Sequence, residues 1–311
     1  MSEDLAPVAV VVCTLNEEAN LARCLRSVQW AQQRFVVDAD STDRTPDIGR
    51  LFGATVVTHQ WTGYSDQKNW ALDNLGFGTK WVLFLDADES VPEELSAEIQ
   101  AVLQKHNSVT TGYYIARRMI FMGRWLKHAW WYPDYNLRLF LRSQGRFENR
   151  LVHESVSLKG TAGYLSKDLV HDDQRDIATY VSRLNRYSSL EAIEMSRRSA
   201  ATEMVGNRMR GSLRGNWAQR RRFVKEQIWY RLPMRPGIRF VWTMIFRLGF
   251  LDGREGLIFT LLQCVSEWHT SAKLYELQAV KRAERFEPSR MPALTFFRTD
   301  TRESDDHPQT D

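Results

Sequence analysis

Apolar runs of strand length alternate with helix-like segments through the first hundred residues, and this alternation constrains the possible folds most. The run Val8–Cys13 is continuously apolar, as is typical of a strand buried on both faces, and Trp81–Leu85 repeats the pattern. Two shorter strands, Phe35–Asp38 and Ala54–Thr58, lie between them. Helices are predicted over Asn16–Ser27, Thr45–Gly53, Asp66–Leu75 and Ser90–Lys105. This order predicts an α/β fold with a doubly wound, mostly parallel, Rossmann-like sheet.

Two polar positions are expected to begin helices. Asn16 can cap the first helix, and Ser90 with Glu93 has the spacing of a capping box. After residue 113 short apolar segments alternate with Gly, Pro and Asn, which indicates strands and loops. Two further helices are predicted, at Asp176–Met204 and Gly256–Val280, and the polar segment from Glu287 onward is expected to be a mobile tail.

Charge is distributed unevenly along the chain. The total is only +4, but residues 205–250 hold eleven basic residues and a single acid, Glu226. That stretch therefore carries +10 and the remainder −6. An acidic body with a basic segment indicates an anionic partner, either a membrane surface or a nucleic acid. The basic residues are Arg208, Arg210, Arg214, Arg220, Arg221, Arg222, Lys225, Arg231, Arg235, Arg239 and Arg247.

Cysteine content and hydropathy narrow the class of protein further. The 3 cysteines are too scattered for a disulfide framework and form no CxxC pair, so a reducing compartment is expected. Met1–Pro7 is acidic and lacks the apolar core of a secretory signal. The longest apolar stretches, Phe240–Phe246 and Leu257–Val265, fall short of the roughly 18–20 residues that a membrane-spanning helix needs.

The segment Asp86-Ala87-Asp88 directly follows the apolar strand Trp81–Leu85. Ligands of doubly wound sheets bind beyond the carboxyl ends of the strands, which is where this segment falls. Residues two apart in extended chain point the same way, so the two carboxylates can converge on a hard divalent cation. The structural alternative is an acidic loop that begins a helix. The position after the fourth strand favours a metal site.

Polar residues also follow the first two strands. Asp38 can accept hydrogen bonds from a ribose or a base, although an Asp/Ser/Thr-rich turn that caps the next helix is the alternative. Backbone amides near Thr14–Glu17 suit a nucleotide at a helix N-terminus. The chain has neither G-x-x-x-x-G-K-[ST] nor G-x-G-x-x-G, so it matches neither the P-loop nor the dinucleotide fingerprint.

Taken together, these motifs resemble family 2 glycosyltransferases. The matching segments V-V-C-T-L-N-E-E, V-V-D-x-x-S-T-D-R-T, G-Y-S-D-Q-K-N-W-A-L and F-L-D-A-D-E span roughly residues 8–105. The later segments G-R-W-L-K-H-A-W-W-Y-P-D-Y-N-L-R-L-F, R-F-E-N-R-L-V-H-E and L-V-H-D resemble the branch of lipopolysaccharide core β-glucosyltransferases. The resemblance implies an A-type glycosyltransferase fold, a nucleotide-sugar donor, a divalent cation (Mg²⁺ or Mn²⁺) and inversion at the anomeric carbon.

Carried over residue by residue, the resemblance assigns two sets of binding residues. The nucleotide-sugar site would comprise Thr14, Asn16, Glu17, Asp38, Lys68, Asp86 and Arg138. The metal site would comprise Asp86, Asp88 and His171. Within the motif, Asp88 is the expected direct ligand. One departure is Asp40, where related sequences commonly carry glycine; aspartate tolerates unusual backbone better than most residues, but its charge lies beside the expected pyrophosphate site.

Glu154, in the segment L-V-H-E, is the candidate general base, because an inverting transfer needs a carboxylate on the acceptor side. The alternative is a surface glutamate that ends a strand. His171 can complete the metal shell or serve as a structural histidine, and both interpretations stay open. Either Arg138 or Arg142 can clamp the diphosphate. The aromatic run Trp130–Tyr132 can stack on an acceptor sugar or belong to the core.

We therefore expect a metal-dependent, inverting transfer from a UDP-sugar to a hydroxyl of a lipid-linked or cell-envelope glycan. The expected domains are a catalytic domain at 1–204, a basic and aromatic helical membrane-associating segment at 205–285, and a disordered tail at 286–311. The expected partners include an anionic membrane surface and no nucleic acid, which places the protein in the cytoplasm, peripherally on the inner face of the cytoplasmic membrane. For the basic segment, the alternative is a folded helical subdomain with solvated arginines.

Two other functional classes stay open. The chain can be a catalytically inactive relative that acts as a membrane-bound carbohydrate-binding or scaffold protein. A nucleotidyltransferase on a similar sheet would need a glycine-rich loop after the first strand, and Cys13–Glu17 contains no glycine.

Overall fold

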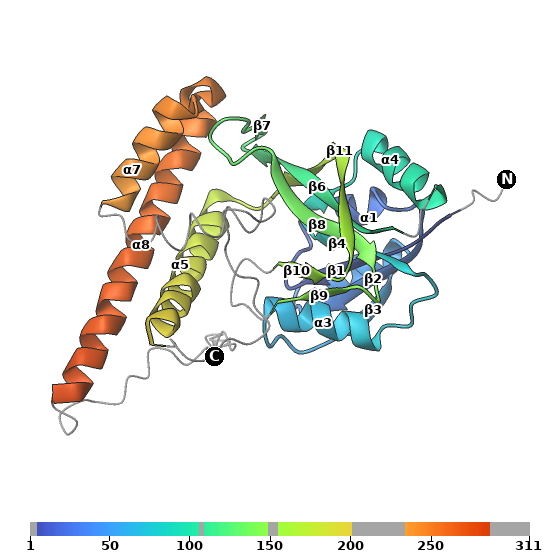
Figure 1. Cartoon of the computed structure of the whole chain (residues 1–311), viewed down its shortest axis with the longest axis horizontal. Coiled ribbons are helices and arrows are strands. Elements are labelled where there is room, and N and C mark those ends of the chain that lie inside the picture. Colours follow the sequence, from blue (N-terminus) through green and yellow to red (C-terminus); the bar gives the residue numbers. More distant parts are fainter. Residues whose placement is uncertain (1–4, 106–108, 149–154, 201–233, 287–311) are drawn as a thin grey trace, which may run out of the picture.

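A computed structural model describes residues 5–105, 109–148, 155–200 and 234–286, with backbone alone for 197–200 and 281–286. Figure 1 shows an α/β body and a separate layer of long helices. The strands are β1 (Ala6–Thr14), β2 (Ala31–Asp38), β3 (Thr55–Thr58), β4 (Trp81–Asp86), β5 (Glu89–Ser90), β6 (Thr110–Phe121), β7 (Arg124–Trp125), β8 (Asp134–Leu141), β9 (Gly145–Phe147), β10 (Val156–Leu158) and β11 (Thr161–Asp172). The helices are α1 (Leu21–Arg26), α2 (Thr45–Leu51), α3 (Tyr64–Asn74), α4 (Glu93–Gln104), α5 (Ile177–Ala200), α7 (Arg235–Val241), the π-helical turn η3 (Trp242–Phe246), the 3-10 turn η4 (Gly249–Asp252) and α8 (Gly253–Phe286).

Within the described residues, 9 strands form one mixed, mostly parallel sheet, and β9 and β10 form a separate small hairpin. The main order is β3-β2-β1-β4-β8-β6-β11-β5, with β7 paired to β6. Strands β1 to β4 are parallel, β8 runs antiparallel between β4 and β6, and β11 is parallel to β6. The register places Thr14 beside Asp38 and Cys13 beside Asp86, so the strand ends that carry the motifs meet at one edge.

The apolar run of β1 is buried on both faces of the sheet. Val8, Val10 and Val12 pack into one hydrophobic cluster together with residues of α1 and α4. Ala9 and Val11 point the other way, into a second cluster with residues of α3. Side chains of successive strand residues alternate between faces, so a strand covered by helices on both sides needs an unbroken apolar run. The prediction of a doubly wound sheet is confirmed.

Two predicted helix starts are wrong. Helix α1 begins at Leu21, and Asn16 lies in a left-handed turn (φ 53°) whose amide donates to Ser41 Oγ. The side chain of Asn16 is used for the loop, where its Oδ1 accepts from the Thr42 amide, and so it caps no helix. Helix α4 begins at Glu93, and Ser90 belongs to β5, so the capping-box spacing has no structural role.

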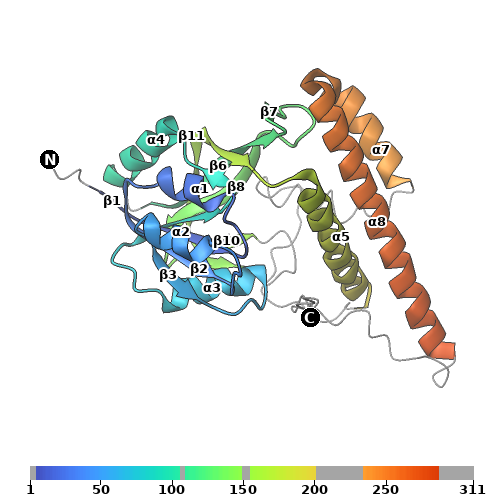
Figure 2. The ribbon, with the colours of Figure 1, turned by 180° about the vertical axis from the view of Figure 1, so that it is seen from behind.

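The C-terminal part forms a helical appendage, as predicted. Figures 1 and 2 show α5 between the α/β body and α8, with α7 folded back along α8. A small core of Phe121, Leu126 and Phe259 joins this layer to the end of β6. The predicted boundary at residue 205, the tail from residue 286 and most of the basic segment lie outside the described residues. Among the helices described, none is long and apolar enough to cross a membrane.

Candidate active site

The loops after β1 and β2 are bound to each other by side-chain hydrogen bonds. Thr14 Oγ1 donates to Asp38 Oδ1 at 2.8 Å, and both residues are buried. Asp38 also accepts from the Ser41 amide at 2.9 Å and the Ser41 hydroxyl at 2.6 Å. The amide of Glu17 donates to Thr45 Oγ1 at 2.8 Å. Thr14, Asn16, Glu17 and Asp38 therefore lie together at one edge of the sheet, with Asp38 holding the turn that follows its own strand.

Asp40 occupies the left-handed region of the backbone, with φ of 60°, and its side chain is exposed. Glycine adopts this conformation without steric cost, and aspartate is among the few other residues that tolerate it. Aspartate in place of the glycine that the family resemblance leads one to expect is thus compatible with the turn. It adds an exposed charge to the loop that Asp38 and Ser41 build.

Asp86, at the end of β4, is bound by two cations. Arg138 Nη2 lies 2.7 Å from its Oδ2, and Lys68 Nζ lies 3.2 Å from its Oδ1. Burial opposes ionisation of Asp86, but Arg138 and Lys68 outweigh it and hold the pKa of the carboxyl well below its usual range. Three predicted residues, from α3, β4 and β8, are therefore brought together. The arrangement fixes Asp86 as a carboxylate with a cationic neighbour on each oxygen.

Glu89 is a site residue that sequence reasoning missed. It is fully buried, its Oε1 lies 2.5 Å from Arg138 Nη2, and its Oε2 accepts from the Asp86 amide at 3.0 Å. Arg117 Nη1 approaches the same carboxyl at 3.6 Å. Burial raises the pKa of Glu89, while Arg138 opposes that rise. The signal available was a third acid in the D-A-D-E segment, and its role is to position Arg138 and the turn after β4.

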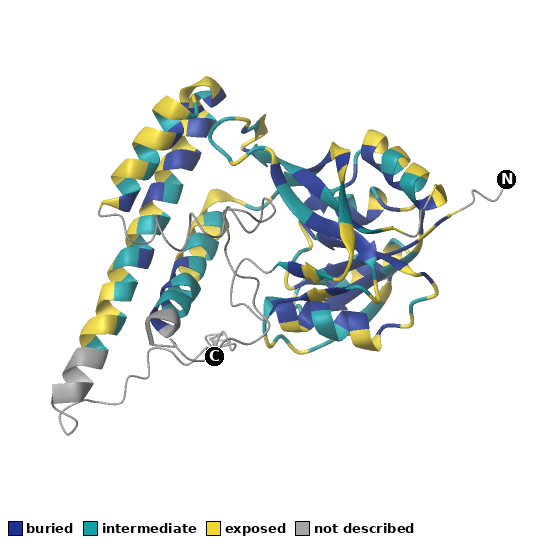
Figure 3. Cartoon of the chain, viewed as in Figure 1, coloured by how far each residue is buried: buried dark blue, intermediate teal, exposed yellow. Residues whose placement is uncertain are grey.

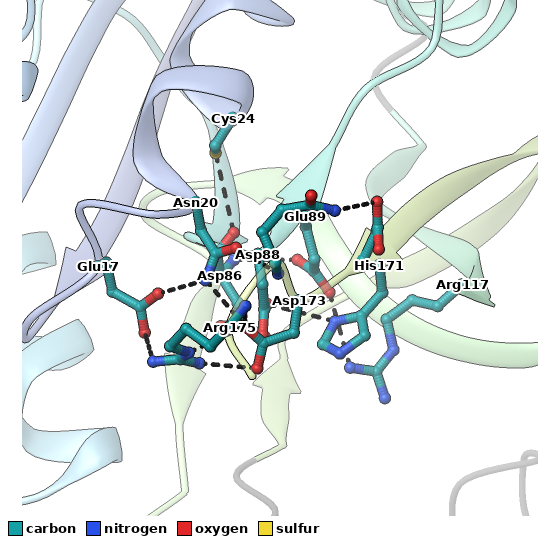
Figure 4. Close-up of polar contacts among 12 residues, drawn as sticks. Glu17, Asn20, Cys24, Asp86, Asp88, Glu89, Arg117, His171, Asp173 and Arg175 are labelled. Carbon is teal, nitrogen blue, oxygen red and sulfur yellow. Dashed lines mark hydrogen bonds and ion pairs between the residues drawn. The ribbon is translucent and has the colours of Figure 1, made fainter. Parts of the chain in front are cut away.

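Asp88 and His171 form the centre of the site. Asp88 Oδ1 and His171 Nδ1 are buried 3.3 Å apart, and neither atom makes a hydrogen bond to any described residue. A protonated His171 would form an ion pair with Asp88 at this distance, whereas with a neutral imidazole the two buried atoms would need a ligand to complete them. In Figure 4, Asp86 and Asp88 lie between the Glu17–Arg175 group and the Glu89–His171–Arg117 group. Among the residues that the structure describes, no three His, Cys, Asp or Glu side chains are grouped as a metal site.

The first turns of α5 and the segment before it close one side of the site. The apolar periodicity of α5 predicted a helix but did not indicate that the helix contributes to the site. Arg183 Nη1 lies 3.4 Å from Asp88 Oδ2, and its Nη2 lies 2.8 Å from Asp173 Oδ2. Burial opposes ionisation of Asp173, but its hydrogen bond from Arg175 and the charge of Arg183 lower its pKa. Asp88 thus has a cationic neighbour that comes from 95 residues farther along the chain.

Glu17 is held by the same segment. Arg175 Nη1 lies 2.9 Å from Glu17 Oε1, and Asn20 Nδ2 donates to its Oε2 at 2.9 Å. Burial raises the pKa of Glu17 to about 7, although Arg175 and Asn20 favour the charged form. Asn20 also donates to Asp173 Oδ1 at 3.1 Å, which connects the loop after β1 to the segment after β11.

Glu154, the predicted general base, lies outside the described residues. The residues around it are placed: the Glu148 amide donates to the Ser155 carbonyl at 2.9 Å. Phe147 exchanges hydrogen bonds with Asn69 at 2.9 and 3.0 Å. Lys68 Nζ lies 5.5 Å from the centre of the Phe147 ring. Phe147, which precedes the undescribed residues 149–154, therefore lies beside the lysine that contacts Asp86.

The other candidates lie elsewhere. Arg142 donates to the Leu72 carbonyl at 3.3 Å and stacks over Phe77, so of the two candidates for the diphosphate clamp only Arg138 lies at the site. The aromatic run contacts the C-terminal helices and β11: Trp130 packs edge-on against Phe259 with ring centres 5.6 Å apart, and Tyr132 Oη donates to Asp168 Oδ2 at 2.9 Å.

The sheet order, the antiparallel β8 and the Asp-Ala-Asp turn at the end of β4 define an A-type glycosyltransferase fold. Residues 9–156 match the family described as glycosyl transferase family 2. The α/β body therefore carries a glycosyl transferase family 2 domain, which takes up a little less than half of the chain.

Several relatives match along most of the chain, two of which are a Rickettsia protein and a Rhizobium protein. An uncharacterized glycosyltransferase of Rickettsia typhi is 26% identical over 286 residues, which cover 88% of this chain and 89% of the relative. The lipopolysaccharide core biosynthesis glycosyltransferase LpsC of Rhizobium meliloti is 26% identical over 283 residues, covering 88% and 94%. Among solved structures, S. aureus TarS 1–349 aligns at 14% identity over 85% of this chain and 91% of that chain, with a TM-score of 0.40.

Proposed function

We propose that this glycosyltransferase moves a sugar from a UDP-sugar to a hydroxyl of a lipid-linked or cell-envelope glycan, with inversion and with help from a divalent cation. The observation that carries the proposal is the buried pair of Asp88 Oδ1 and His171 Nδ1, 3.3 Å apart and without hydrogen bonds, beside the neutralised carboxylate of Asp86. The match to the lipopolysaccharide core enzyme LpsC supports the class of acceptor.

The donor set fits a divalent cation in part. Asp88 and His171 would hold it, since a carboxylate oxygen and a neutral imidazole nitrogen are both common ligands. Asp86 is the third expected ligand, and both of its oxygens lie next to cationic side chains. When bound, such a cation would neutralise the diphosphate leaving group. Arg183, 3.4 Å from Asp88, is a competing positive charge that would have to give up this contact.

The remaining residues would bind and orient the donor. The loops of Thr14–Glu17 and Asp38–Thr45 would receive the nucleoside, with their shape maintained by the Thr14–Asp38 and Asn16–Ser41 hydrogen bonds. Arg138 and Lys68 bring positive charge to the end of β4, where the diphosphate is expected. Guanidinium and ammonium groups in a partly buried site favour a developing phosphate charge.

Glu154 would take the proton of the acceptor hydroxyl while that oxygen attacks the anomeric carbon and the UDP oxygen leaves. The position of Phe147, which precedes the undescribed segment and lies against Lys68, supports this role. We expect Glu154→Gln to lower transfer at least about a hundredfold while donor binding is unchanged. Glu94→Gln, an exposed glutamate on α4, is the matched control and should leave transfer unchanged. Normal turnover by E154Q would exclude Glu154 as the base.

The donor is testable without an acceptor. Thermal shifts with UDP-, GDP- and dTDP-sugars, each with Mg²⁺, Mn²⁺ or no metal, should show the largest stabilisation for a UDP-sugar with metal. A larger shift with a GDP- or dTDP-sugar would overturn the UDP assignment. Metal-dependent binding without hydrolysis or transfer to any envelope acceptor would favour the catalytically inactive alternative.

We further propose a catalytic domain ending near residue 204, a membrane-associating segment at 205–285 and a tail from 286. The protein would lie in the cytoplasm, against the inner face of the cytoplasmic membrane, where it would meet its acceptor. The net charge of +10 in residues 205–250 supports this location, because cationic segments are drawn to anionic lipid.

A further inference from the structure

The tip of the helical hairpin exposes large apolar side chains. The tip comprises η3, η4 and the turn between them, where Phe246 is 68% and Trp242 46% exposed, with their rings stacked 5.5 Å apart. Figure 3 shows that exposed residues continue along α7 and the outer side of α8. Contiguous exposed apolar surface of this kind marks an interaction site in a folded protein. The exposed apolar residues of the tip are Trp242, Ile245, Phe246, Leu248, Phe250 and Leu251.

One more exposed apolar residue, Met122, comes from the turn that follows strand β6. The turn between β6 and β7 places Met122 in the left-handed region (φ 50°), 64% exposed, and Leu248 at the hairpin tip also has a left-handed backbone (φ 60°). The two turns are neighbours, because Arg124 Nη2 donates to the Leu251 carbonyl at 3.1 Å. Left-handed backbone is unfavourable for large side chains, and such strain tends to persist at functional positions.

The described arginines of the basic segment turn inward. Arg239 Nη1 lies 2.8 Å from Glu267 Oε1, and Arg235 Nη2 donates to Ser271 Oγ at 2.6 Å, so both fasten α7 to α8. Arg247 donates to the Trp130 carbonyl at 2.6 Å and lies over the Trp131 ring at 4.8 Å. These three cations brace the hairpin, and the outward surface they leave is apolar.

Cationic side chains outnumber acidic ones around the tip. Arg124, Lys127 and Arg254 are exposed at this end of the molecule. The acids there are engaged: Asp252 accepts from the amides of His128 at 2.8 Å and Ala129 at 2.6 Å, and Glu255 lies 3.6 Å from Arg124. An apolar surface with aromatic residues and a rim of Arg and Lys matches the headgroup region of an anionic bilayer.

Strand β6 connects the tip to the active site. Met119 pairs with His171 in the sheet register, and Met122 lies three residues farther along. At ~3.3 Å per residue of strand, Met122 is on the order of 10 Å along the chain from Met119, the residue paired with His171. A lipid-linked sugar held in the headgroup layer would then be within reach of the site.

We propose that Met122 and the hairpin tip insert into the interfacial region of an anionic bilayer and hold the active site at its surface. The inference rests on the proposed function, since a lipid-linked acceptor explains why the active site would be held at the bilayer surface. Binding itself needs neither donor nor metal, so it can be tested separately.

The test is co-sedimentation of the full chain with vesicles of phosphatidylethanolamine and phosphatidylglycerol, and with vesicles of phosphatidylcholine alone. We expect wild-type protein to sediment with the anionic vesicles and Phe246→Ser/Phe250→Ser to bind them at least about tenfold more weakly. The matched control is Leu51→Ser/Tyr164→Ser, which removes two residues on the α/β body that are 79% and 52% exposed. The control should bind as wild type.

Three outcomes would overturn the proposal: no binding by wild type, equal binding by the two double variants, or a fall in melting temperature of F246S/F250S by several degrees. The last would mean that another part of the chain, residues 201–233 included, covers the tip.

Light scattering adds a check on a second occupant of the tip. If F246S/F250S converts a dimer to a monomer and leaves vesicle binding unchanged, the tip binds a second copy of the chain. The thermal shift with UDP and Mg²⁺ is measured in parallel. If wild type shows no such thermal shift, this counts against the proposed function but does not affect the conclusion on vesicle binding.

Discussion

The active-site edge of the sheet and the tip of the helical hairpin distribute charged and apolar side chains in opposite ways. At the sheet edge Asp86, Glu89 and Arg138 are wholly or partly buried and bound to one another. At the tip Phe246 and Leu248 are exposed, and Arg247 is directed into the protein. A charge buried beside an opposite charge is held in place for chemistry, whereas an exposed aromatic side chain is available to a partner. This difference fits our proposals that the sheet edge carries out catalysis and that the tip attaches the protein to a membrane.

The largest expected effect is at the sheet edge. Asp88→Asn keeps the size of the side chain but removes the charge that faces His171 and Arg183. We expect transfer to fall by about 10²–10³ or more, because stabilisation of the leaving group is the main electrostatic contribution to such reactions. Turnover measured with and without Mn²⁺ tests this, with circular dichroism to verify folding. Asp47→Asn, an exposed aspartate on α2, is the control. Wild-type turnover in D88N would show that the buried pair is structural.

The second prediction compares two phenylalanines. Phe84, in β4, is 1% exposed, and its ring centre lies 4.8 Å from that of Phe147, whereas Phe246 is 68% exposed. Phe84→Ala should cost about 3–5 kcal/mol in the free energy of unfolding. Phe246→Ala should change it by less than about 0.5 kcal/mol. Urea unfolding of both variants measures this, and a similar loss for both would mean that the tip is covered in solution.

Much of the sheet edge could be predicted from sequence, because each strand and its following loop are local. The unbroken apolar run at Val8–Cys13 required helices on both faces, and the position of Asp86 after Trp81–Leu85 placed it at the ligand-binding end. The start of α1 could not be predicted in the same way. Asn16 has the chemistry of a helix cap, but hydrogen bonds to Ser41 and Thr42, on another loop, decide its conformation.

Contacts that depend on the course of α5 were beyond local reasoning. Arg183 meets Asp88 across 95 residues and Arg175 meets Glu17 across 158, and nothing near either arginine in the sequence indicates such a partner. The tip is a similar case. Arginines and aromatic residues alternate there in sequence. Only the structure shows that Arg247 points inward and holds the hairpin, whereas Phe246 points into solvent.

A third prediction concerns the contact between η4 and the loop after β7, which connects the helical hairpin to the α/β body. Asp252 is buried and accepts hydrogen bonds from the His128 and Ala129 amides at 2.8 and 2.6 Å. Asp252→Ala leaves those donors unsatisfied, which should cost about 2–3 kcal/mol at this contact. Faster amide hydrogen exchange at His128 and Ala129 would report the loss. Asp73→Ala, an exposed aspartate paired with Arg146, is the control and should leave that exchange unchanged. Unchanged exchange in D252A would mean that other contacts suffice to hold the hairpin.

The smallest effect is a pH dependence at Glu17. Its pKa rises to about 7 in the folded protein from an ordinary 4.5, with burial as the main cause, so the folded state binds more protons than the unfolded state between these values. The free energy of unfolding should therefore fall as pH rises from about 4.5 to 7, and stay lower above that range. One pKa unit corresponds to about 1.4 kcal/mol. Because the side chain is 16% exposed and solvent screens part of the effect, we expect the free energy of unfolding to fall by about 1–2 kcal/mol in total, less than the full shift would give.

Glu17→Gln removes the ionisation, so its stability relative to wild type should increase from pH 5 to pH 8. Urea unfolding at pH 5, 6, 7 and 8 measures the difference. Glu18→Gln, at the exposed neighbouring position, should follow the wild-type profile. Parallel profiles for wild type and E17Q would mean that Arg175 and Asn20, each 2.9 Å from the carboxylate, keep Glu17 ionised despite its burial. The loop after β1 would then carry a permanent negative charge beside the donor site, and a donor's diphosphate would depend more strongly on Arg138 and Lys68.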